Sequence, residues 1–356
     1  MSARIVLLSL PVRVGKTTFL REWARSRPPG SVGGICGPEE KGLRVMEEWG
    51  TGLRHPWELG GGEGLGEVVE VGRFRFRADG FRWGLERLWA AAEDPTVQTV
   101  LVDELGPLEV REGRGLEPGL GAWLAAMRQP RQAGREVVLV VRDFLLAEAV
   151  ACWGLQDAEV NPAELIPPLG DVVGVVLAGG RSTRMGRDKA YLMQVDPANA
   201  PEQDRLPAYD RAARQLLRCL PPGAPVAISG PGHYPPYPGW PDRPDLAGAG
   251  PRSGLLTLAA QFPGRALLVV GVDYPHLMDN ALHRLLACHR LTGKSACFAA
   301  AEDGQVEPLV SLITAEDCAW LGETGEPVKG VWTARGGIIL PHDPRLQLIS
   351  IDTPQP

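Results

Sequence analysis

Twice along this chain, a short and largely apolar segment runs directly into a glycine-containing loop that carries basic residues. The first is Arg4–Leu10, followed by Gly15 and Lys16, and the second is Val172–Leu177, followed by LAGGRSTRMGRDK. Apolar runs of this length are typical of strands buried in a parallel sheet, and a glycine loop after such a strand is typical of nucleotide-binding α/β folds. The two occurrences predict two α/β units in one chain.

Further apolar runs alternate with helical stretches in both halves, which predicts parallel sheets covered by helices. In the first half the strands are Thr99–Val102 and Val137–Val141, with helices at Thr17–Arg27 and Phe81–Ala92; in the second the strands are Pro225–Ser229, Ala266–Val272 and Ser295–Ala300, with helices at Ala208–Leu220 and Ala281–Arg290. The length of 356 residues suits two domains. The proline-rich stretch Asn161–Gly170 reads as a linker, so we place the boundary at residue 168 and predict domains 1–168 and 169–356.

Composition excludes several classes of protein. A formal charge of −6 offers no broad basic surface for a polynucleotide backbone, so we expect no nucleic-acid partner. The six cysteines are scattered without metal-ligand spacing, which predicts reduced core thiols rather than disulfides or zinc. No apolar segment reaches the 18 or so residues of a membrane span, and we expect a cytoplasmic protein with no membrane association.

The first loop, SLPVRVGKTT, holds the second half of the phosphate-loop signature G-x-x-x-x-G-K-[ST] in Gly15, Lys16 and Thr17. Backbone N–H groups of residues 13–17 are expected to cradle the β-phosphate, Lys16 to bridge the β and γ oxygens and Thr17 to bind Mg²⁺, with Thr18 also predicted to bind nucleotide. The first glycine of the signature is replaced by Leu10.

A second motif, TVLVDELGPLEV, supports this interpretation. Asp103 and Glu104 follow a buried apolar run, where Asp103 is predicted to hold Mg²⁺ through water and Glu104 to polarise the attacking water. The alternative is an ordinary strand-to-helix turn at VGKTT and a solvated strand end at Asp103 and Glu104.

With these motifs and VVRDFLLAEAV, residues 3–160 resemble the thermophilic-type nucleoside-triphosphatase family. The resemblance implies a P-loop NTPase sheet that hydrolyses ATP or GTP, with Lys16 and Thr17 on phosphate and Mg²⁺ and Glu104 as the base. The family pattern has glycine where this chain has Leu10 and Arg13. A non-catalytic nucleotide-binding or docking module therefore stays open for this half.

The second loop is the more specific signal. Gly179 and Gly180 allow the main chain to approach a nucleotide closely, and main-chain groups of Leu177, Ala178 and Gly179 can read a base edge without side chains. Arg184 and Lys189 of this loop are predicted to neutralise the triphosphate and to act in catalysis.

Further along, RALLVVGVDYPHL is an apolar strand that ends near Asp273. Open α/β sheets bind ligands at the carboxyl ends of their strands, so Asp273 is predicted to bind Mg²⁺ and to act in catalysis. Its alternative reading is a helix N-cap.

Residues 172–354 resemble the molybdenum cofactor guanylyltransferase family, through LAGGRSTRMGRDKA, PDRPDLAGAGPRSGLL, VDYPHL, VEPLVSL and IDTP. The resemblance implies a Rossmann-like nucleotidyltransferase that uses Mg²⁺ to transfer GMP from GTP to molybdopterin-bound metal. It assigns Leu177, Ala178 and Gly179 to guanine, Lys189 to phosphate, Asp242 to nucleotide and Asp273 to Mg²⁺. Ser229, also predicted to bind nucleotide, stands where the family commonly has Asn.

Two departures bear on the acceptor: the stretch MQVDPANAPEQDRLPAYD replaces a Gly-Lys-Pro turn, and Ser350–Pro354 replaces Asn-x-Asn-Thr-Pro. Alternatives therefore remain: a cytidylyltransferase, a cobinamide-phosphate guanylyltransferase, or a degenerate binding module. The fusion suggests that the first half gates cofactor delivery, with cofactor-delivery proteins or target molybdoenzymes as partners.

Overall fold

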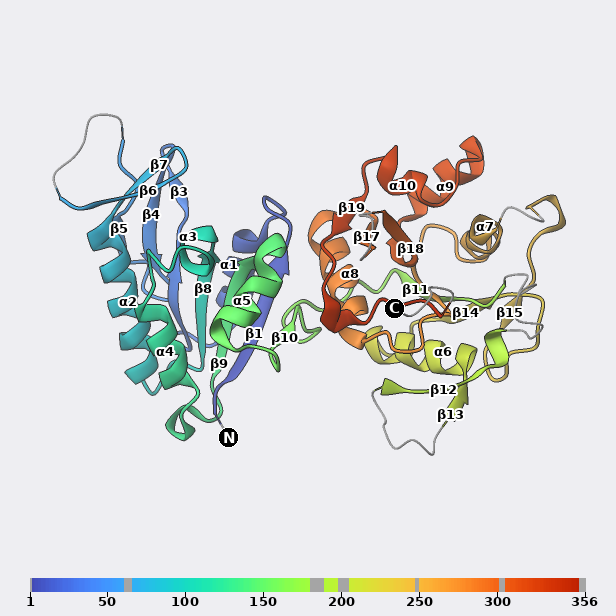
Figure 1. Cartoon of the computed structure of the whole chain (residues 1–356), viewed down its shortest axis with the longest axis horizontal. Coiled ribbons are helices and arrows are strands. Elements are labelled where there is room, and N and C mark those ends of the chain that lie inside the picture. The colour runs from blue at the N-terminus through green and yellow to red at the C-terminus, as the bar shows by residue number, and fades with distance from the viewer. Residues whose placement is uncertain are drawn as a thin grey trace. The chain divides into compact units, whose positions relative to one another are not determined.

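A computed structural model describes residues 2–60, 66–179, 189–197, 205–246, 250–300 and 305–351. The chain divides into two compact units, Met1–Asn161 and Pro162–Pro356, each of which is an α/β fold (Figure 1). The predicted fold class is confirmed. The predicted boundary at residue 168 lies in the irregular stretch that opens the second unit.

The N-terminal unit is built on a largely parallel sheet. Its strands lie in the order β10 (Glu159–Val160), β1 (Arg4–Leu10), β9 (Glu136–Arg142), β8 (Thr99–Leu105), β2 (Val32–Cys36), β4 (Leu43–Glu48) and β3 (Glu39–Glu40), with β5 (Arg54–Pro56) also paired to β4. The pairs from β10 to β2 are parallel, and β4 runs antiparallel to β2. A separate hairpin joins β6 (Val68–Val71) to β7 (Phe74–Arg77).

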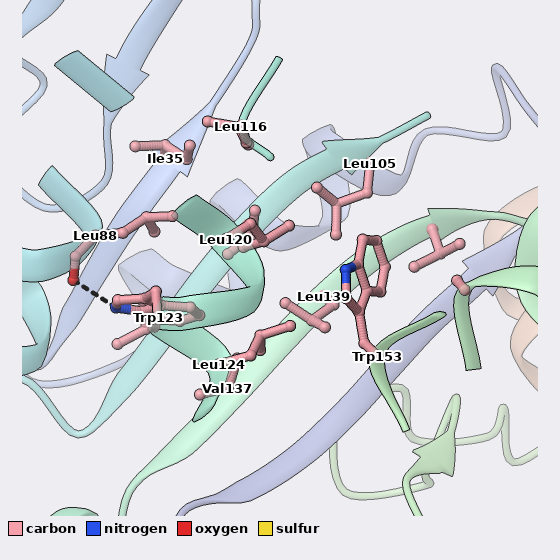
Figure 2. Close-up of a cluster of buried hydrophobic side chains, with 14 of the residues drawn as sticks. Ile35, Leu88, Leu105, Leu116, Leu120, Trp123, Leu124, Val137, Leu139 and Trp153 are labelled. Atoms are coloured by element: carbon pink, nitrogen blue, oxygen red, sulfur yellow. Dashed lines mark hydrogen bonds between the residues drawn. The ribbon is translucent and has the colours of Figure 1, made fainter. Parts of the chain in front are cut away.

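Helices surround this sheet and bury its apolar strands. They are α1 (Lys16–Arg25), α2 (Ala78–Glu93), α3 (Pro107–Val110), α4 (Gly119–Met127) and α5 (Leu146–Trp153), with short 3₁₀ turns η1 (Pro130–Gln132) and η2 (Asp143–Leu145). Figure 2 shows the core in which leucines of α4 meet Val137 and Leu139 of β9. Trp123 of α4 is fully buried, and its indole N–H donates to the carbonyl of Leu88 at 2.9 Å.

The C-terminal unit has a seven-stranded sheet in the order β15 (Gly239–Trp240), β14 (Val226–Ser229), β11 (Val172–Leu177), β16 (Ala266–Gly271), β18 (Val306–Ile313), β17 (Ala296–Ala299) and β19 (Ile338–Leu340). The pairs from β15 to β16 are parallel, and β18 runs antiparallel to both of its neighbours. Because the chain passes from β11 to β14 on one side and later to β16 on the other, the strand order reverses at β11. Ligands of open α/β sheets bind at such a reversal.

The helices of this unit are α6 (Ala208–Cys219), α7 (Pro251–Gln261), α8 (Asp279–Thr292), α9 (Ala315–Thr324) and α10 (Gly330–Thr333), with 3₁₀ turns η3 (Lys189–Tyr191), η5 (Pro244–Leu246) and η6 (Pro344–Leu346). A hairpin pairs β12 (Met193–Val195) with β13 (Arg205–Pro207) ahead of α6. None of the helices in the described parts of the chain is long and apolar enough to cross a bilayer.

Three sequence expectations need correction. The strand with the apolar run Thr99–Val102, expected to end in Asp103 and Glu104, continues to Leu105, because the ladder with β9 resumes there after an irregularity. Asn161, expected in the linker, is buried and bonded to Ser9 of β1 through both ends of its amide. Cys152 is exposed, whereas the other five cysteines are buried as expected.

We predict that Leu120→Ala destabilises the N-terminal unit by about 2–5 kcal/mol, because the truncation leaves a cavity between α4 and the sheet. Leu120 is fully buried, whereas Leu53 of the same unit is 55% exposed. Leu53→Ala is therefore the matched control, with an expected effect within about 0.5 kcal/mol. Hydrogen exchange of peptides from the N-terminal unit against urea concentration measures both; equal effects would contradict the packing described here.

Candidate functional site

The loop after β1 requires two left-handed backbone positions. Gly15, which precedes α1, has φ 89°, and Arg13 has φ 62°. A side chain in the left-handed region costs about 1–2 kcal/mol, which explains why the signature has glycine at position 15 and the pattern of the resembled family has glycine at position 13. Arg13 is held in a glycine conformation, so the loop keeps its backbone path without the glycine.

Lys16 lies inside this loop and is buried. Its ammonium donates to the carbonyls of Leu10 (3.0 Å) and Pro11 (2.9 Å) and pairs with Glu104 Oε1 at 3.4 Å. Leu10 is fully buried as the last residue of β1, so its side chain belongs to the sheet core and only its carbonyl faces the loop. Of the predicted residues, the fold therefore brings Lys16 and Glu104 into contact.

Thr17 and Asp103 also meet, although they are far apart in sequence. The Thr17 hydroxyl donates to Asp103 Oδ2 at 2.6 Å. Burial raises the pKa of Asp103 to about 6, against this hydrogen bond, and its Oδ1 is buried with no hydrogen-bond partner in the described part of the chain. A hydroxyl beside a carboxylate with one unsatisfied buried oxygen is a donor set that suits Mg²⁺. Thr18, in the same turn of α1, is exposed.

Sequence reasoning missed two charged residues next to this cluster. Arg142 ends β9 opposite Leu10, and its Nε lies 3.9 Å from Glu104 Oε1, the oxygen that also pairs with Lys16. Glu109 is buried and accepts a hydrogen bond from the Gly106 N–H at 3.1 Å. The available signal was the placement of Arg142 at the end of an apolar run, VVLVVR, where parallel strands present their carboxyl ends together.

In the C-terminal unit, the glycine loop leaves the sheet at the strand reversal. Leu177 pairs with Ser229 on one side and Gly271 on the other. The N–H groups of Ala178 and Gly179 both donate to the Ser229 carbonyl, at 2.9 and 3.0 Å. The main chain predicted to read the base is therefore fixed against β14.

Asp273 lies at the same edge of the sheet. The Val272 N–H donates to the carbonyl of Leu177 at 3.2 Å, which ties the segment carrying Asp273 to the start of the glycine loop. The Ser350 hydroxyl donates to Asp273 Oδ2 at 3.1 Å, and the N–H of Ile351 donates to the Asp273 carbonyl at 2.9 Å. The N-cap reading does not apply, because α8 begins at Asp279.

A second carboxylate near Asp273 was not singled out from sequence. Glu307 lies at the start of β18, which runs antiparallel beside β16. Burial raises the pKa of Glu307, the negative charge of Asp273 acts in the same direction, and a hydrogen bond with Tyr274 acts against both. The motif VEPLVSL contained the signal, since its Glu stands at the start of an apolar run.

The remaining predicted residues of this unit take separate places. Asp242 accepts a hydrogen bond from the hydroxyl of the buried Ser253 in the first turn of α7. Ser229 is buried, and its hydroxyl packs against the same turn at Gly254, where a Cβ would meet it. Lys189 opens η3. Gly180 and Arg184 lie outside the described residues.

Asp273 and Glu307 place two carboxylates close to each other at the edge of the C-terminal sheet where the glycine loop begins. Mg²⁺ in nucleotide enzymes is commonly held by one or two carboxylates together with substrate phosphates, and this pair fits that requirement. Within the described ranges, no group of three or more His, Cys, Asp or Glu side chains is placed to hold a metal by itself. Both sites therefore suit a metal that arrives with nucleotide.

Comparisons with known proteins bear on the C-terminal unit. The sequence model of one family, described as the MobA-like NTP transferase domain, matches residues 174–328. A molybdenum cofactor guanylyltransferase of Rhizobium leguminosarum is 34% identical over 159 residues, covering 42% of this chain and 69% of that protein. One of Rhodobacter capsulatus is 34% identical over 123 residues, covering 33% of this chain and 58% of that protein.

Among solved structures, THEP1 from Aquifex aeolicus aligns with 39% of this chain and 76% of its own, at 15% identity and a TM-score of 0.30, which carries no argument about function. The sequence matches, by contrast, identify the family. The chain belongs to the MobA-like NTP transferase family, and its C-terminal unit is a nucleotidyltransferase.

We predict that Glu109→Gln changes how stability depends on pH. Burial raises the pKa of Glu109 from 4.5 to about 7. Between pH 4.5 and 7, Glu109 is therefore ionised in the unfolded chain and still protonated in the folded one. The wild-type N-terminal unit thus loses stability as the pH rises through this range. Glutamine keeps an acceptor for the Gly106 N–H and has no proton to lose. The advantage of the variant should grow by about 3 kcal/mol across this window.

Denaturant unfolding at several pH values measures this difference. A difference between Glu109→Gln and wild type that stays constant from pH 4.5 to 7 would show that the Glu109 carboxyl titrates as it does in the unfolded chain.

Proposed function

We propose that the C-terminal unit transfers GMP from GTP to molybdenum-bound molybdopterin, forming a guanine dinucleotide cofactor and releasing pyrophosphate. The observation that carries the proposal is the hydrogen bond from the Val272 N–H to the Leu177 carbonyl, which ties the segment carrying Asp273 to the start of the glycine loop at the strand reversal. Support also comes from the two relatives named molybdenum cofactor guanylyltransferase.

In this reaction an oxygen of the acceptor's terminal phosphate attacks the α-phosphorus of GTP in line. A new P–O bond forms as the bond to the β-phosphate oxygen breaks, and pyrophosphate leaves with the electron pair. The attacking oxygen is already anionic at neutral pH, so the protein needs no general base. Catalysis then rests on position and charge.

The chain's residues divide these tasks. Main-chain groups of Leu177–Gly179, other than the two N–H groups that the Ser229 carbonyl accepts and the Leu177 carbonyl that accepts from Val272, would recognise the base edge. Lys189 and Arg184 supply positive charge for the triphosphate. Asp273, with Glu307 beside it, would hold Mg²⁺, which when bound offsets the charge that develops on the α-phosphate and pyrophosphate. Asp242 orders the start of α7 through Ser253.

For the N-terminal unit we propose Mg²⁺-dependent binding and hydrolysis of ATP or GTP. The contact between Thr17 and Asp103 and the unsatisfied Asp103 Oδ1 support a metal position beside Lys16. Glu104 is the proposed base, and its neighbours Lys16 and Arg142 would orient it. Incoming phosphates would take over the ammonium donors that Lys16 now directs at Leu10 and Pro11.

We predict that Asp273→Asn lowers GMP transfer at least about 100-fold, because it removes the charge that holds the metal and keeps the side-chain shape. Incorporation of α-labelled GTP into molybdenum-loaded molybdopterin, with CTP and ATP in parallel, measures it. Asp171→Asn is the control, since Asp171 is an exposed residue at the start of β11. Product from CTP instead of GTP, or from cobinamide phosphate as the only acceptor, would replace the proposed reaction.

We predict that Thr17→Val lowers phosphate release from ATP or GTP at least about tenfold, because the variant loses the hydroxyl and leaves Asp103 Oδ2 unpaired. Lys16→Ala should do the same and leave GMP transfer intact. Thr51→Val, which alters an exposed threonine bonded to Glu48, is the control. A wild-type chain that binds nucleotide without releasing phosphate would make this unit a binding module.

A further inference from the structure

Arg211 of α6 is a charged residue that the proposed chemistry does not use, and it is fully buried. Its Nε donates to Gln194 Oε1 at 2.8 Å and its Nη1 donates to Gln215 Oε1 at 3.0 Å. Its Nη2 has no hydrogen-bond partner in the described part of the chain. A buried guanidinium without full satisfaction is expensive to keep, which calls for a reason beyond packing.

The two glutamines carry the hydrogen bonds onward to the main chain. Gln194 Nε2 donates to the Val272 carbonyl at 3.0 Å, and Gln215 Nε2 donates to the Leu277 carbonyl at 2.6 Å. These carbonyls lie on either side of Asp273 in sequence. One buried arginine therefore reaches both ends of the segment that carries the metal-binding carboxylate.

The choice of arginine fixes the direction of this network. A guanidinium only donates hydrogen bonds, so each glutamine must turn its carbonyl oxygen toward Arg211 and its NH₂ toward the loop. A neutral side chain at this position would leave the amides free to rotate, and a lysine would lack the two-pronged geometry. Burial lowers the pKa of Arg211 only to about 10, so the donor set persists at neutral pH.

A negatively charged residue, Asp196, lies near the positive charge of Arg211. Asp196, itself buried, lies close enough to act electrostatically on Arg211 and forms an ion pair with Arg218 at 2.7 Å. Arg218 also pairs with Asp279 at the start of α8. These contacts link β12, α6 and α8, and through the two glutamines they reach the segment 272–277.

We propose that Arg211 is a positioning residue for Asp273, holding residues 272–277 through Gln194 and Gln215 so that the carboxylate meets Mg²⁺ and GTP without rearranging. The inference rests on the proposed function of the C-terminal unit. Residues that orient a metal ligand from behind typically change metal affinity or activity 10–100-fold when lost. Preorganisation of this kind acts on the metal step more than on recognition of the base.

Arg211→Met tests the proposal, because methionine fills similar space without donors. Arg214→Met is the matched control: Arg214 lies on the same helix, is exposed, and pairs with Asp210 one turn away. GMP transfer is measured against Mg²⁺ concentration at saturating GTP. We expect Arg211→Met to raise the Mg²⁺ concentration for half-maximal rate about tenfold and to lower kcat, with the KM for GTP within about twofold.

Gln215→Leu provides a second variant in case Arg211→Met does not fold; it releases the Leu277 carbonyl and Arg211 Nη1 and keeps the bonds through Gln194. A readout independent of turnover is equilibrium binding of Mn²⁺ to the full chain with GTP present, in which both variants should bind Mn²⁺ more weakly than wild type. If the variants bind Mn²⁺ more weakly but even the wild type transfers no GMP to molybdopterin, the role of Arg211 is supported and the proposed acceptor is wrong. Mg²⁺ dependence and Mn²⁺ affinity equal to those of Arg214→Met would overturn the inference.

Discussion

The parallel pairing of β11 with a neighbour on each side is the constraint on which the C-terminal site depends. Leu177 is bonded in register with Ser229 and Gly271, so the ends of three strands lie at fixed spacing. Neither the glycine loop nor Asp273 can move along the sheet without breaking these main-chain bonds. The proximity of the glycine loop to the segment that carries Asp273 is therefore a property of the sheet.

The same principle operates in the N-terminal unit with different chemistry. There β1 and β8 are separated by β9, and the contact between Thr17 and Asp103 bridges this gap. Arg142 on the intervening strand supplies a cation between them, next to Glu104. Each unit thus gathers groups from three adjacent strands, and in each a carboxylate lies partly or wholly out of water, where charge interactions are stronger.

Local patterns in the sequence predicted the central strands of both sheets and several of the helices, because burial of whole strands leaves an apolar run in the sequence. The residues that sequence reasoning missed share the opposite property. Arg142, Glu307 and Arg211 acquire their roles from strand order and helix packing, which bring together positions far apart in the chain. No spacing rule relates Arg211 to Val272 or Leu277.

The extension of β8 was missed for a related reason. The apolar run ends at Val102, yet the strand continues through the two carboxylates because the ladder with β9 resumes at Leu105. Charged residues within a strand look like a loop when read from polarity alone, and only the neighbouring strand shows that they are held in place.

The side-chain amide of Asn161, the last residue of the N-terminal unit, limits where this unit can be separated from the rest of the chain. Ser9 is fully buried near the end of β1, and both its N–H and its carbonyl are satisfied by Asn161, at 2.8 and 2.9 Å. A reading frame that stopped one codon earlier would leave two buried main-chain groups of β1 unpaired, at about 1–3 kcal/mol each. Any exchange of this unit onto another domain, in the laboratory or in evolution, must carry that asparagine with it.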